Sequence, residues 1–273
     1  MKTEIYSGME SMSMINKGKI CLYCLGFLVI ILLFSTCSGK KDSYIENAAK
    51  NPENSYQIGA IYLSDGNYLQ AEIEFKRAIS LDPNNPKYHN ALGLAYLFSN
   101  RLYHATEAFK RALSFAPNEP DYHNNLGTAY MEMGEHDLAK DEYMQVAQVT
   151  SYPALFKTYF NIGQIYAEEK NFPEAINYFQ KSLQLNPNSP YTHTQLGLVY
   201  EQANKPGNAA KQYKEALRLD SDFIPANYNL GILMFKKGMR VEAKQYFQKV
   251  IQKRPNSEMG EKAKEFLNLI SSE

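Results

Sequence analysis

Glycine recurs at a nearly fixed spacing in this 273-residue chain, and that spacing constrains the fold more than any other feature. The glycines are Gly59, Gly93, Gly127, Gly163, Gly197 and Gly231, and their numbers rise in steps of 34, 34, 36, 34 and 34. A repeat of this length is one supersecondary unit, which cannot bury its own apolar face. We therefore expect an array of stacked units rather than a fold around one central core.

Other residue types recur with the same period. With Pro52 as repeat position 1, the glycines take position 8, position 20 is always alanine, and position 24 is always phenylalanine or tyrosine. Position 11 is tyrosine in five repeats, with Met234 the departure, and position 32 is proline in four. This pattern resembles the tetratricopeptide repeat (TPR) family from about Pro52 to Ser257. The resemblance implies an all-α, right-handed α-solenoid of six helical hairpins, at 52–85, 86–119, 120–155, 156–189, 190–223 and 224–257.

Each repeat reads as two amphipathic helices, A and B. In repeat 2 these are "YHNALGLAYLFS" and "YHATEAFKRALSF", with apolar residues at i, i+3/i+4 and i+7. Small residues at positions 8 and 20 let the two helices approach, and the aromatic rings at positions 11 and 24 are expected to fill the space between hairpins. Prolines after helix B end it.

A further helix is predicted after repeat 6, over residues 258–273. Met259, Ala263, Phe266, Leu267 and Ile270 fall on one face of it, and charged residues fall on the other. Solenoid ends need covering, so we interpret this segment as a capping helix.

The single irregular step lies before repeat 4. Pro153 precedes Gly163 by the usual ten residues, so the two extra residues lie between Tyr143 and Pro153. Either helix B of repeat 3 or its exit loop is longer. Repeats 1–3 and 4–6 are then predicted to be two regular halves that meet at an irregular joint.

The N-terminus carries an export signal. Lys17 and Lys19 precede the apolar run 20–34, which is shorter than the roughly 20 residues needed to cross a bilayer. The run ends in "FSTC", which resembles a bacterial lipobox. The resemblance implies a signal peptide over 1–36, lipidation of Cys37 and a polar tether over 37–51. Phe34 and Thr36 depart from the usual lipobox, so an uncleaved N-terminal anchor remains open, as does a start at Met14.

No enzyme motif is present. Lys+Arg and Asp+Glu are 29 each, so net charge provides no long-range attraction to nucleic acid. The three cysteines all lie in the first 37 residues, and no phosphate loop, H-E-x-x-H or nucleophile elbow occurs. We expect no catalysis, cofactor, metal, nucleic acid or small-molecule substrate. His89, His123 and His193 share position 4, where packing and hydrogen bonding are favoured over metal ligation because no cysteine or carboxylate shares that position.

The candidate site is the concave surface, which helix A lines in this family at positions 2, 5, 9, 12 and 13. The resemblance implies a groove for a protein or peptide partner, although part of the set can instead pack between repeats. The groove residues are Tyr56, Leu63, Asn90, Leu94, Leu97, Phe98, Asn124, Met131, Phe160, Tyr191, Leu198, Tyr228, Ile232 and Phe235.

The whole arrangement resembles the pilotin-type lipoproteins of type IV pilus biogenesis. Beyond the signal and six repeats, Tyr152, Pro153 and the Asn-x-Gly at 161–163 match that family ahead of its fourth repeat. The resemblance implies lipid attachment to a membrane facing the periplasm, with Ser38 permitting the outer membrane, and assistance to secretin assembly. The alternative is a periplasmic adaptor that recruits cell-wall hydrolases or other envelope proteins.

Overall fold

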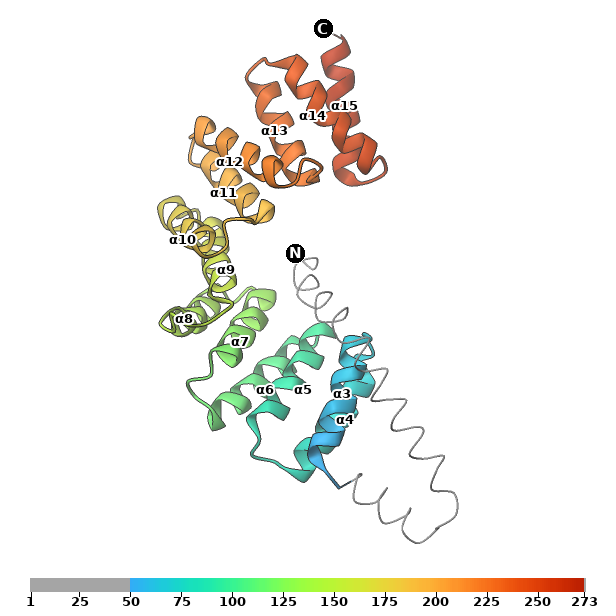
Figure 1. Ribbon diagram of the computed structural model, residues 1–273, viewed down its shortest axis with the longest axis vertical. Coiled ribbons are helices and arrows are strands. Elements are labelled where there is room, and N and C mark those ends of the chain that lie inside the picture. The colour runs from blue at the N-terminus through green and yellow to red at the C-terminus, as the bar shows by residue number, and fades with distance from the viewer. Residues whose placement is uncertain (1–49, 273) are drawn as a thin grey trace. The chain divides into compact units, whose positions relative to one another are not determined.

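The computed structural model describes residues 50–272, which form thirteen α helices and no strand (Figure 1). The A helices are α3 (Pro52–Ser64), α5 (Pro86–Phe98), α7 (Pro120–Met133), α9 (Leu155–Glu168), α11 (Pro190–Gln202) and α13 (Ile224–Lys236). The B helices are α4 (Tyr68–Leu81), α6 (Leu102–Phe115), α8 (His136–Ala147), α10 (Phe172–Leu185), α12 (Pro206–Leu219) and α14 (Arg240–Lys253), and α15 (Glu258–Ser272) follows. The all-α prediction is confirmed. The predicted signal run, Cys37 and most of the tether lie outside the described residues.

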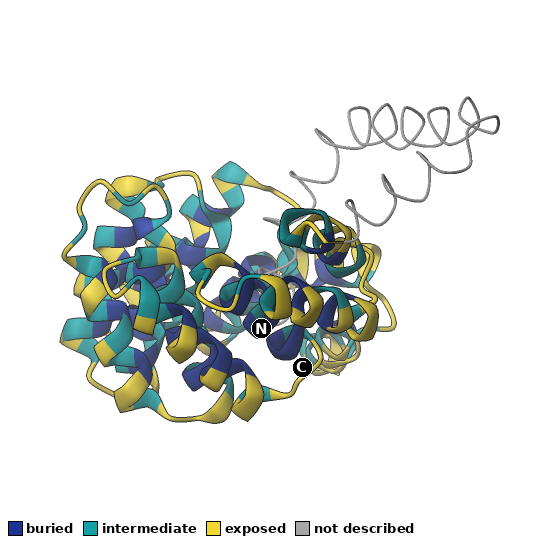
Figure 2. Ribbon diagram, turned by 90° about the horizontal axis from the view of Figure 1, so that it is seen from below, coloured by how far each residue is buried: buried dark blue, intermediate teal, exposed yellow. Residues whose placement is uncertain are grey.

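The described chain divides into two compact units, one ending at Glu135 and the other beginning at His136. In the first unit α3–α4 and α5–α6 pack as hairpins, and α7 packs on α6. In the second, α8 packs on α9, and α9–α10, α11–α12 and α13–α14 form hairpins, with α15 against α14. Buried residues follow the helix faces that meet, and exposed residues follow the outer turns and loops (Figure 2).

The turn from helix A to helix B is the same in all six repeats. Position 15 has a left-handed backbone each time, with φ from 56° to 78°, at Gly66, Asn100, Gly134, Lys170, Asn204 and Gly238. The next residue donates its backbone N–H to the carbonyl of position 11, as in Asn67 to Tyr62 at 2.8 Å and Met239 to Met234 at 2.9 Å. This is a Schellman-type ending, which satisfies the last carbonyls of helix A. In the five repeats that lie within one unit, helix B then packs along helix A.

Glycine at position 8 allows the close approach of the two helices. A Cβ built on Gly59 would lie 2.6 Å from the Phe75 ring, and one built on Gly231 would lie 2.8 Å from the Phe247 ring. In five repeats the position-24 ring therefore contacts the glycine of its own hairpin. These rings thus pack within a hairpin as well as toward the next one, where they were expected, as the stacking of Phe247 on Phe266 of α15 shows.

The position-11 tyrosines do lie between successive hairpins, as expected. Tyr96 of repeat 2 donates its hydroxyl hydrogen bond to Glu72 of repeat 1 at 3.1 Å, and Gln180 donates to the Tyr200 hydroxyl at 3.3 Å. Each tyrosine thus ties its helix A to the B helix of the preceding repeat.

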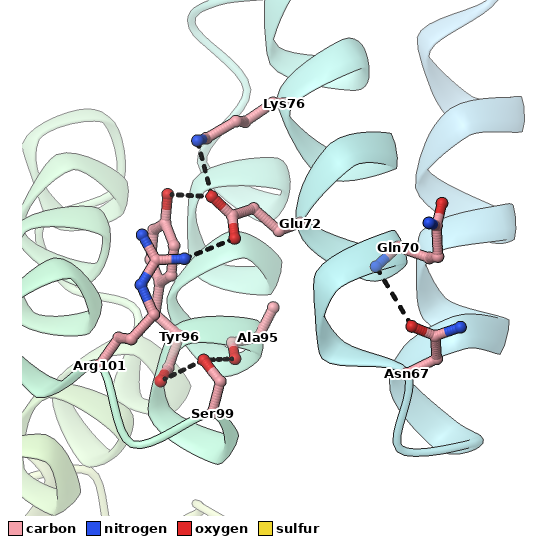
Figure 3. Close-up of polar contacts among 8 residues, drawn as sticks. All are labelled: Asn67, Gln70, Glu72, Lys76, Ala95, Tyr96, Ser99 and Arg101. Carbon is pink, nitrogen blue, oxygen red and sulfur yellow. Dashed lines mark hydrogen bonds and ion pairs between the residues drawn. The ribbon is translucent and has the colours of Figure 1, made fainter.

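Glu72 accepts hydrogen bonds from three side chains in the first unit (Figure 3). It is buried, and it binds Lys76 at 2.7 Å and Arg101 at 2.6 Å as well as the Tyr96 hydroxyl. Burial alone would raise the pKa of Glu72, but the hydrogen bonds from Lys76 and Tyr96 and the charges of Lys76 and Arg101 outweigh it and lower that pKa. A charged clamp therefore joins repeats 1 and 2.

The two extra residues before repeat 4 lie in a loop. Helix α8 ends at Ala147, two residues shorter than the other B helices, and the connection 148–154 is longer than its counterparts such as 82–85. Tyr152 donates its N–H to Val149 O at 2.9 Å, and Leu155 donates to Tyr152 O at 3.1 Å. These turns bring α8 directly onto α9, so the extra residues are absorbed inside the second unit.

The division between units differs from the predicted joint. It falls at Glu135–His136, within repeat 3, rather than near Pro153. The physical reason is the loop 148–154, whose consecutive turns hold α8 against α9 and so place the B helix of repeat 3 with repeat 4.

Candidate partner-binding surface

The outward face of each A helix is a stripe at positions 2, 6, 9 and 13. These positions are separated by four, three and four residues, so they lie above one another on one helix face. Most of them are partly buried or exposed, whereas positions 5 and 12 lie beside the stripe and are often deeper. Twelve of the fourteen predicted groove residues are partly buried, which leaves part of each side chain open to contact: Tyr56, Leu63, Asn90, Leu94, Phe98, Asn124, Met131, Tyr191, Leu198, Tyr228, Ile232 and Phe235.

Leu97 and Phe160 were predicted to line the groove, and for these two residues the prediction is wrong. They are only 9% and 8% exposed and belong to the core. Phe160 has its ring centroid 5.4 Å from that of Phe179 and 5.3 Å from that of Tyr191. Bulky apolar side chains at the deeper positions 5 and 12 gain more from neighbouring apolar groups than from solvent, so they turn inward.

In the first unit the polar groups of this surface already bond to one another. Lys87 lies over the Tyr56 ring, 4.1 Å from its centroid, and pairs with Glu53 at 3.3 Å. Asn125 donates its side-chain amide to Asn90 Oδ1 at 2.9 Å. A ligand here would have to displace these contacts.

In the second unit the same stripe carries carboxamides that are open for bonding. Asn161, Gln195 and Asn229 occupy position 6 on α9, α11 and α13, and all three are partly buried. Among the residues that the structure describes, none of these three side chains makes a hydrogen bond. Position 6 was not among the predicted groove positions, yet the sequence held a signal, because it is Asn or Gln in five of six repeats.

Apolar side chains flank these carboxamides. Leu198 and Ile232 take position 9 on α11 and α13, and both pack partly against the core of the second unit. Tyr228 and Phe235 also contact core rings, with Tyr228 6.3 Å from Phe247 and Phe235 5.2 Å from Phe266 between centroids. The surface therefore offers both apolar contact and paired donors and acceptors.

The Glu201 carboxylate places a negative charge at the edge of this surface. It accepts a hydrogen bond from the buried Tyr213 hydroxyl at 2.7 Å and pairs with Lys236 at 3.4 Å. Burial, and then the Glu201 carboxylate, raise the pKa of Tyr213 well above its usual range, so the phenol stays protonated. The hydroxyl therefore holds Glu201 in place.

The three position-4 histidines perform a structural role, as favoured from the sequence. The Nε2 atoms of His89, His123 and His193 lie 2.7, 2.8 and 3.1 Å from the carbonyl oxygens of Pro83, Pro117 and Pro187, six residues upstream. Asn227 takes this place in repeat 6 and donates to Ser221 O at 3.0 Å. Each side chain fixes the loop that enters its A helix.

Helical hairpins that recur at a fixed spacing, with a glycine under an aromatic ring and a shared A-to-B turn, define a helical-repeat protein. Matches to family profiles agree: those described as "Tetratricopeptide repeat" cover residues 86–119, 120–151, 156–189 and 226–257, and one described as "TPR repeat" covers 59–97 and 202–238. The chain belongs to the tetratricopeptide repeat family. No helix within residues 50–272 is long and apolar enough to span a membrane.

Individual relatives share shorter stretches. The chain is 34% identical over 82 residues to a protein O-mannosyl-transferase of Caenorhabditis elegans, covering 30% of this chain and 12% of that one. It is 29% identical over 147 residues to the type IV pilus assembly protein PilF of Pseudomonas aeruginosa, covering 54% of this chain and 58% of PilF. The chain thus spans only part of the length of these relatives.

Two solved structures resemble nearly the whole repeat array. The structure of Pseudomonas aeruginosa PilF has a TM-score of 0.68 and 23% identity, and the match covers 79% of this chain and 96% of PilF. The structure of PilW, described as a widely conserved type IV pilus biogenesis factor, has a TM-score of 0.71 and 20% identity, with coverage of 77% and 97%. At these identities the likeness establishes the fold.

Proposed function

We propose that this protein is a non-enzymatic scaffold that binds a protein partner on the A-helix surface of its second unit. The observation that carries the proposal is the row of carboxamides at Asn161, Gln195 and Asn229, without hydrogen bonds among the described residues and next to Leu198 and Ile232. A carboxamide offers a donor and an acceptor together, which matches the backbone amides of a polypeptide. The adjacent aliphatic groups suit its apolar side chains.

We further propose that the scaffold acts in type IV pilus assembly, attached to a membrane by a lipid on Cys37. Support comes from the match to PilF over 147 residues and from the coverage of almost all of PilF and PilW by the fold. The lipobox-like "FSTC" supports lipid attachment, and Ser38 permits the outer membrane as the destination. The secretin is proposed as the partner on the resemblance to the pilotin-type lipoproteins. The O-mannosyl-transferase match covers only 12% of that relative, so it supports no catalytic role.

The test of the binding surface replaces Asn161, Gln195 and Asn229 together with alanine. In a strain lacking the native gene, we expect this variant to accumulate normally but to restore secretin multimers in membranes at a level at least about tenfold below wild type. Three lost hydrogen bonds at about 0.5–1.5 kcal/mol each would produce such a loss.

A matched control carries alanine at Asn177 and Gln245, exposed carboxamides at position 22 of α10 and α14. It should behave as wild type. If the triple variant supports full secretin assembly, the surface assignment is wrong. If secretin assembly is normal without the protein altogether, the pilus role is wrong and a search for other envelope partners is required.

Lipid attachment is tested separately, with radiolabelled palmitate. We expect label on the wild-type protein, which should fractionate with membranes, and none on Cys37→Ser. An unlabelled wild-type chain that retains residues 1–36 would instead establish the uncleaved N-terminal anchor.

A further inference from the structure

A pocket of about 500 Å³ lies between repeats 4 and 5, inside the second unit. Residues of α10 and of the loop after it form one wall, and residues of α11 and α12 form the other: Gln180, Leu183, Gln184, Pro187, His193, Leu196 and Gln212. None of them takes position 2, 6, 9 or 13 of its repeat. The pocket is therefore separate from the carboxamide stripe of the A helices.

The equivalent place between repeats 3 and 4 holds a tyrosine ring. Tyr178, at position 23 of repeat 4, has its ring centroid 6.0 Å from that of Tyr159, and its hydroxyl donates to Met144 Sδ at 3.6 Å. Met144 and Tyr159 take positions 25 and 4, which are the positions of Gln180 and His193 at the pocket. The ring of Tyr178 therefore fills the space that is open between repeats 4 and 5.

A glutamine at position 23 of repeat 5 accounts for the open space. That residue is Gln212, whereas the repeats on either side carry Tyr178 and Tyr246 there, both partly buried. Tyr246 packs against the core of the second unit. Because Gln212 has no ring, the crevice keeps the apolar side chains of Leu183 and Leu196 without the group that covers such side chains in the neighbouring repeats.

His193 is the aromatic residue of the pocket, and within residues 136–272 no other ring lies against it. The equivalent histidine of repeat 2, His89, has the ring of Phe115 stacked on it, with centroids 5.7 Å apart. Phe115 takes position 30, which in repeat 5 is Leu219. His193 thus lacks the aromatic neighbour that the position-4 ring has in repeats 2 and 4.

The polar groups of the pocket suit a neutral ligand. Neither nitrogen of His193 is free to bind a metal or an acid, because Nδ1 lies 2.8 Å from Gln212 Oε1 and Nε2 lies 3.1 Å from a carbonyl oxygen of the preceding loop. Gln180 donates its Nε2 to the Tyr200 hydroxyl, which leaves its Oε1 as an acceptor, and the exposed Gln184 makes no hydrogen bond among the described residues. No lysine, arginine, aspartate or glutamate lines the pocket. A hydroxyl group can donate to one of these carboxamides and accept from another.

We propose that this pocket binds a phenol ring, the side chain of a tyrosine. The ring takes the place that Tyr178 holds one repeat earlier and lies between the face of His193 and the side chain of Leu183. Its hydroxyl donates to Gln180 Oε1, as the Tyr178 hydroxyl donates to the residue at the same position, and accepts from Gln184. A pocket of about 500 Å³ is within the usual range for ligands and also admits the backbone next to the ring.

The tyrosine belongs to a protein partner, and this part of the inference rests on the proposed function. The preference of the pocket for a phenol does not rest on it, because no pocket residue lies on the carboxamide stripe. A second copy of this chain is the other source to be tested, since Tyr103 on α6 is 67% exposed.

The test uses N-acetyltyrosinamide as the probe and the full-length protein in detergent micelles. The readout is the shift of the His193 ring signals in nuclear magnetic resonance spectra as the probe is added. N-acetylphenylalaninamide lacks the hydroxyl and should bind about threefold or more weakly, because one hydrogen bond is lost. N-acetylleucinamide lacks the ring and should cause no shift at the same concentrations. Partition into micelles would favour the two apolar probes and so cannot produce this order.

Filling the pocket from within provides the matched comparison. Gln212→Tyr restores the ring of the neighbouring repeats, so it should lower the affinity for N-acetyltyrosinamide at least about tenfold without lowering the thermal unfolding midpoint. Gln245→Tyr adds the same ring at an exposed site of α14 and should bind the probe as wild type does. If Gln212→Tyr does not fold, Gln184→Ala replaces it, and this change should weaken the tyrosine probe about twofold or more and leave the phenylalanine probe unchanged.

Three outcomes would overturn the proposal. The first is equal affinity for the tyrosine and leucine probes, and the second is unchanged affinity in Gln212→Tyr. The third is a wild-type dimer in sedimentation that both the tyrosine probe and Tyr103→Ala dissociate, which would make a second copy the source of the ring. The triple alanine variant of the carboxamide stripe should bind the probe as wild type does, so failure of the proposed function and failure of this pocket are distinguishable.

Discussion

The first and last hairpins of this protein are held in different ways. At the last hairpin, α15 closes the end with aromatic rings: Phe266 stacks on Phe247 with centroids 4.9 Å apart and planes within 4°. At the first hairpin, α3 leaves Ile58 and Ile61 open in the described chain, and the link to repeat 2 is the charged clamp of Glu72 with Lys76 and Arg101. Apolar stacking thus holds the last hairpin, whereas the first is joined to its neighbour by a buried carboxylate whose contribution depends on pH.

The largest effect is expected from removing α15. A chain that stops at Ser257 would expose Phe247 and lose the contacts of Phe266 and Leu267. Partly buried side chains of this size make the loss about 3 kcal/mol or more, so the midpoint should fall by about 6 °C or more, with aggregation. Thermal unfolding by circular dichroism measures this, with Leu269→Ala, 51% exposed on α15, as the near-neutral control. An unchanged midpoint after truncation would mean that α15 is not a cap.

A smaller loss of stability is expected when the position-8 glycine is replaced, and its size should differ between the last and the first hairpin. Gly231→Ala pushes a Cβ against Phe247, which is fixed by the ring of Phe266, and should cost about 1–3 kcal/mol. A Cβ at Gly59 would lie 2.6 Å from the buried Phe75 ring, closer than the 2.8 Å at Phe247. The aromatic neighbour of Phe75 is Tyr56, tilted at 5.9 Å rather than stacked, so we expect the Phe75 ring to shift more and the cost to be smaller.

Denaturant unfolding compares these two variants with Gly207→Ala, a helical site where an added Cβ meets nothing within 4 Å. That control should be neutral or slightly stabilising because alanine favours helix. Equal losses at Gly231 and Gly59 would mean that the two ends are equally rigid.

The charged clamp makes the first hairpin sensitive to acid. The folded state lowers the pKa of Glu72 below its ordinary value of 4.5, so its contribution is present above about pH 4.5 and is lost as the pH falls through the lower, folded-state pKa. Glu72→Gln should therefore cost about 1–3 kcal/mol at pH 7, and this difference should disappear in acid.

Hydrogen exchange between pH 7 and pH 3 measures where stability is lost. The amides of α3 and α4 should lose protection before those of α13 to α15, and Glu107→Gln, which breaks only the exposed pair with Lys110, should match wild type. Loss of protection at both ends together would show that the clamp does not set acid sensitivity.

The smallest effects are expected at the helix caps. Asn51 caps α3, and Ser257 accepts from Gly260 N at 3.1 Å at the start of α15. Replacing either with alanine should cost about 0.5–2 kcal/mol. We expect Asn51→Ala to speed exchange in α3 alone and Ser257→Ala in α15 alone. If a substitution at one helix cap speeds hydrogen exchange at the other end of the repeat array, the two ends are not independently stable.

Most residues of the candidate surface could be predicted from the sequence, but how deeply each side chain is buried could not. Repeat positions placed Leu198 and Ile232 on the A-helix stripe, because helical periodicity depends only on spacing. The same reasoning placed Leu97 and Phe160 there as well, and both are core residues. Whether a side chain at the edge of a stripe turns inward depends on rings contributed by other helices, such as Phe179 and Tyr191 beside Phe160, and spacing along one helix carries no such information.

The sequence by itself determined the repeat, its helices and the role of the position-4 histidines, because each follows from the repeat period or from contacts between residues close together in the chain. Tertiary structure alone decided that the extra residues near Pro153 form a loop and that the compact units divide at Glu135. It also decided which position-6 side chains are open for bonding: Asn161, Gln195 and Asn229 are, and Asn125 is not. Those features depend on which residues of neighbouring helices contact a given side chain. Packing between repeats decides that, and a pattern shared by all repeats cannot distinguish them.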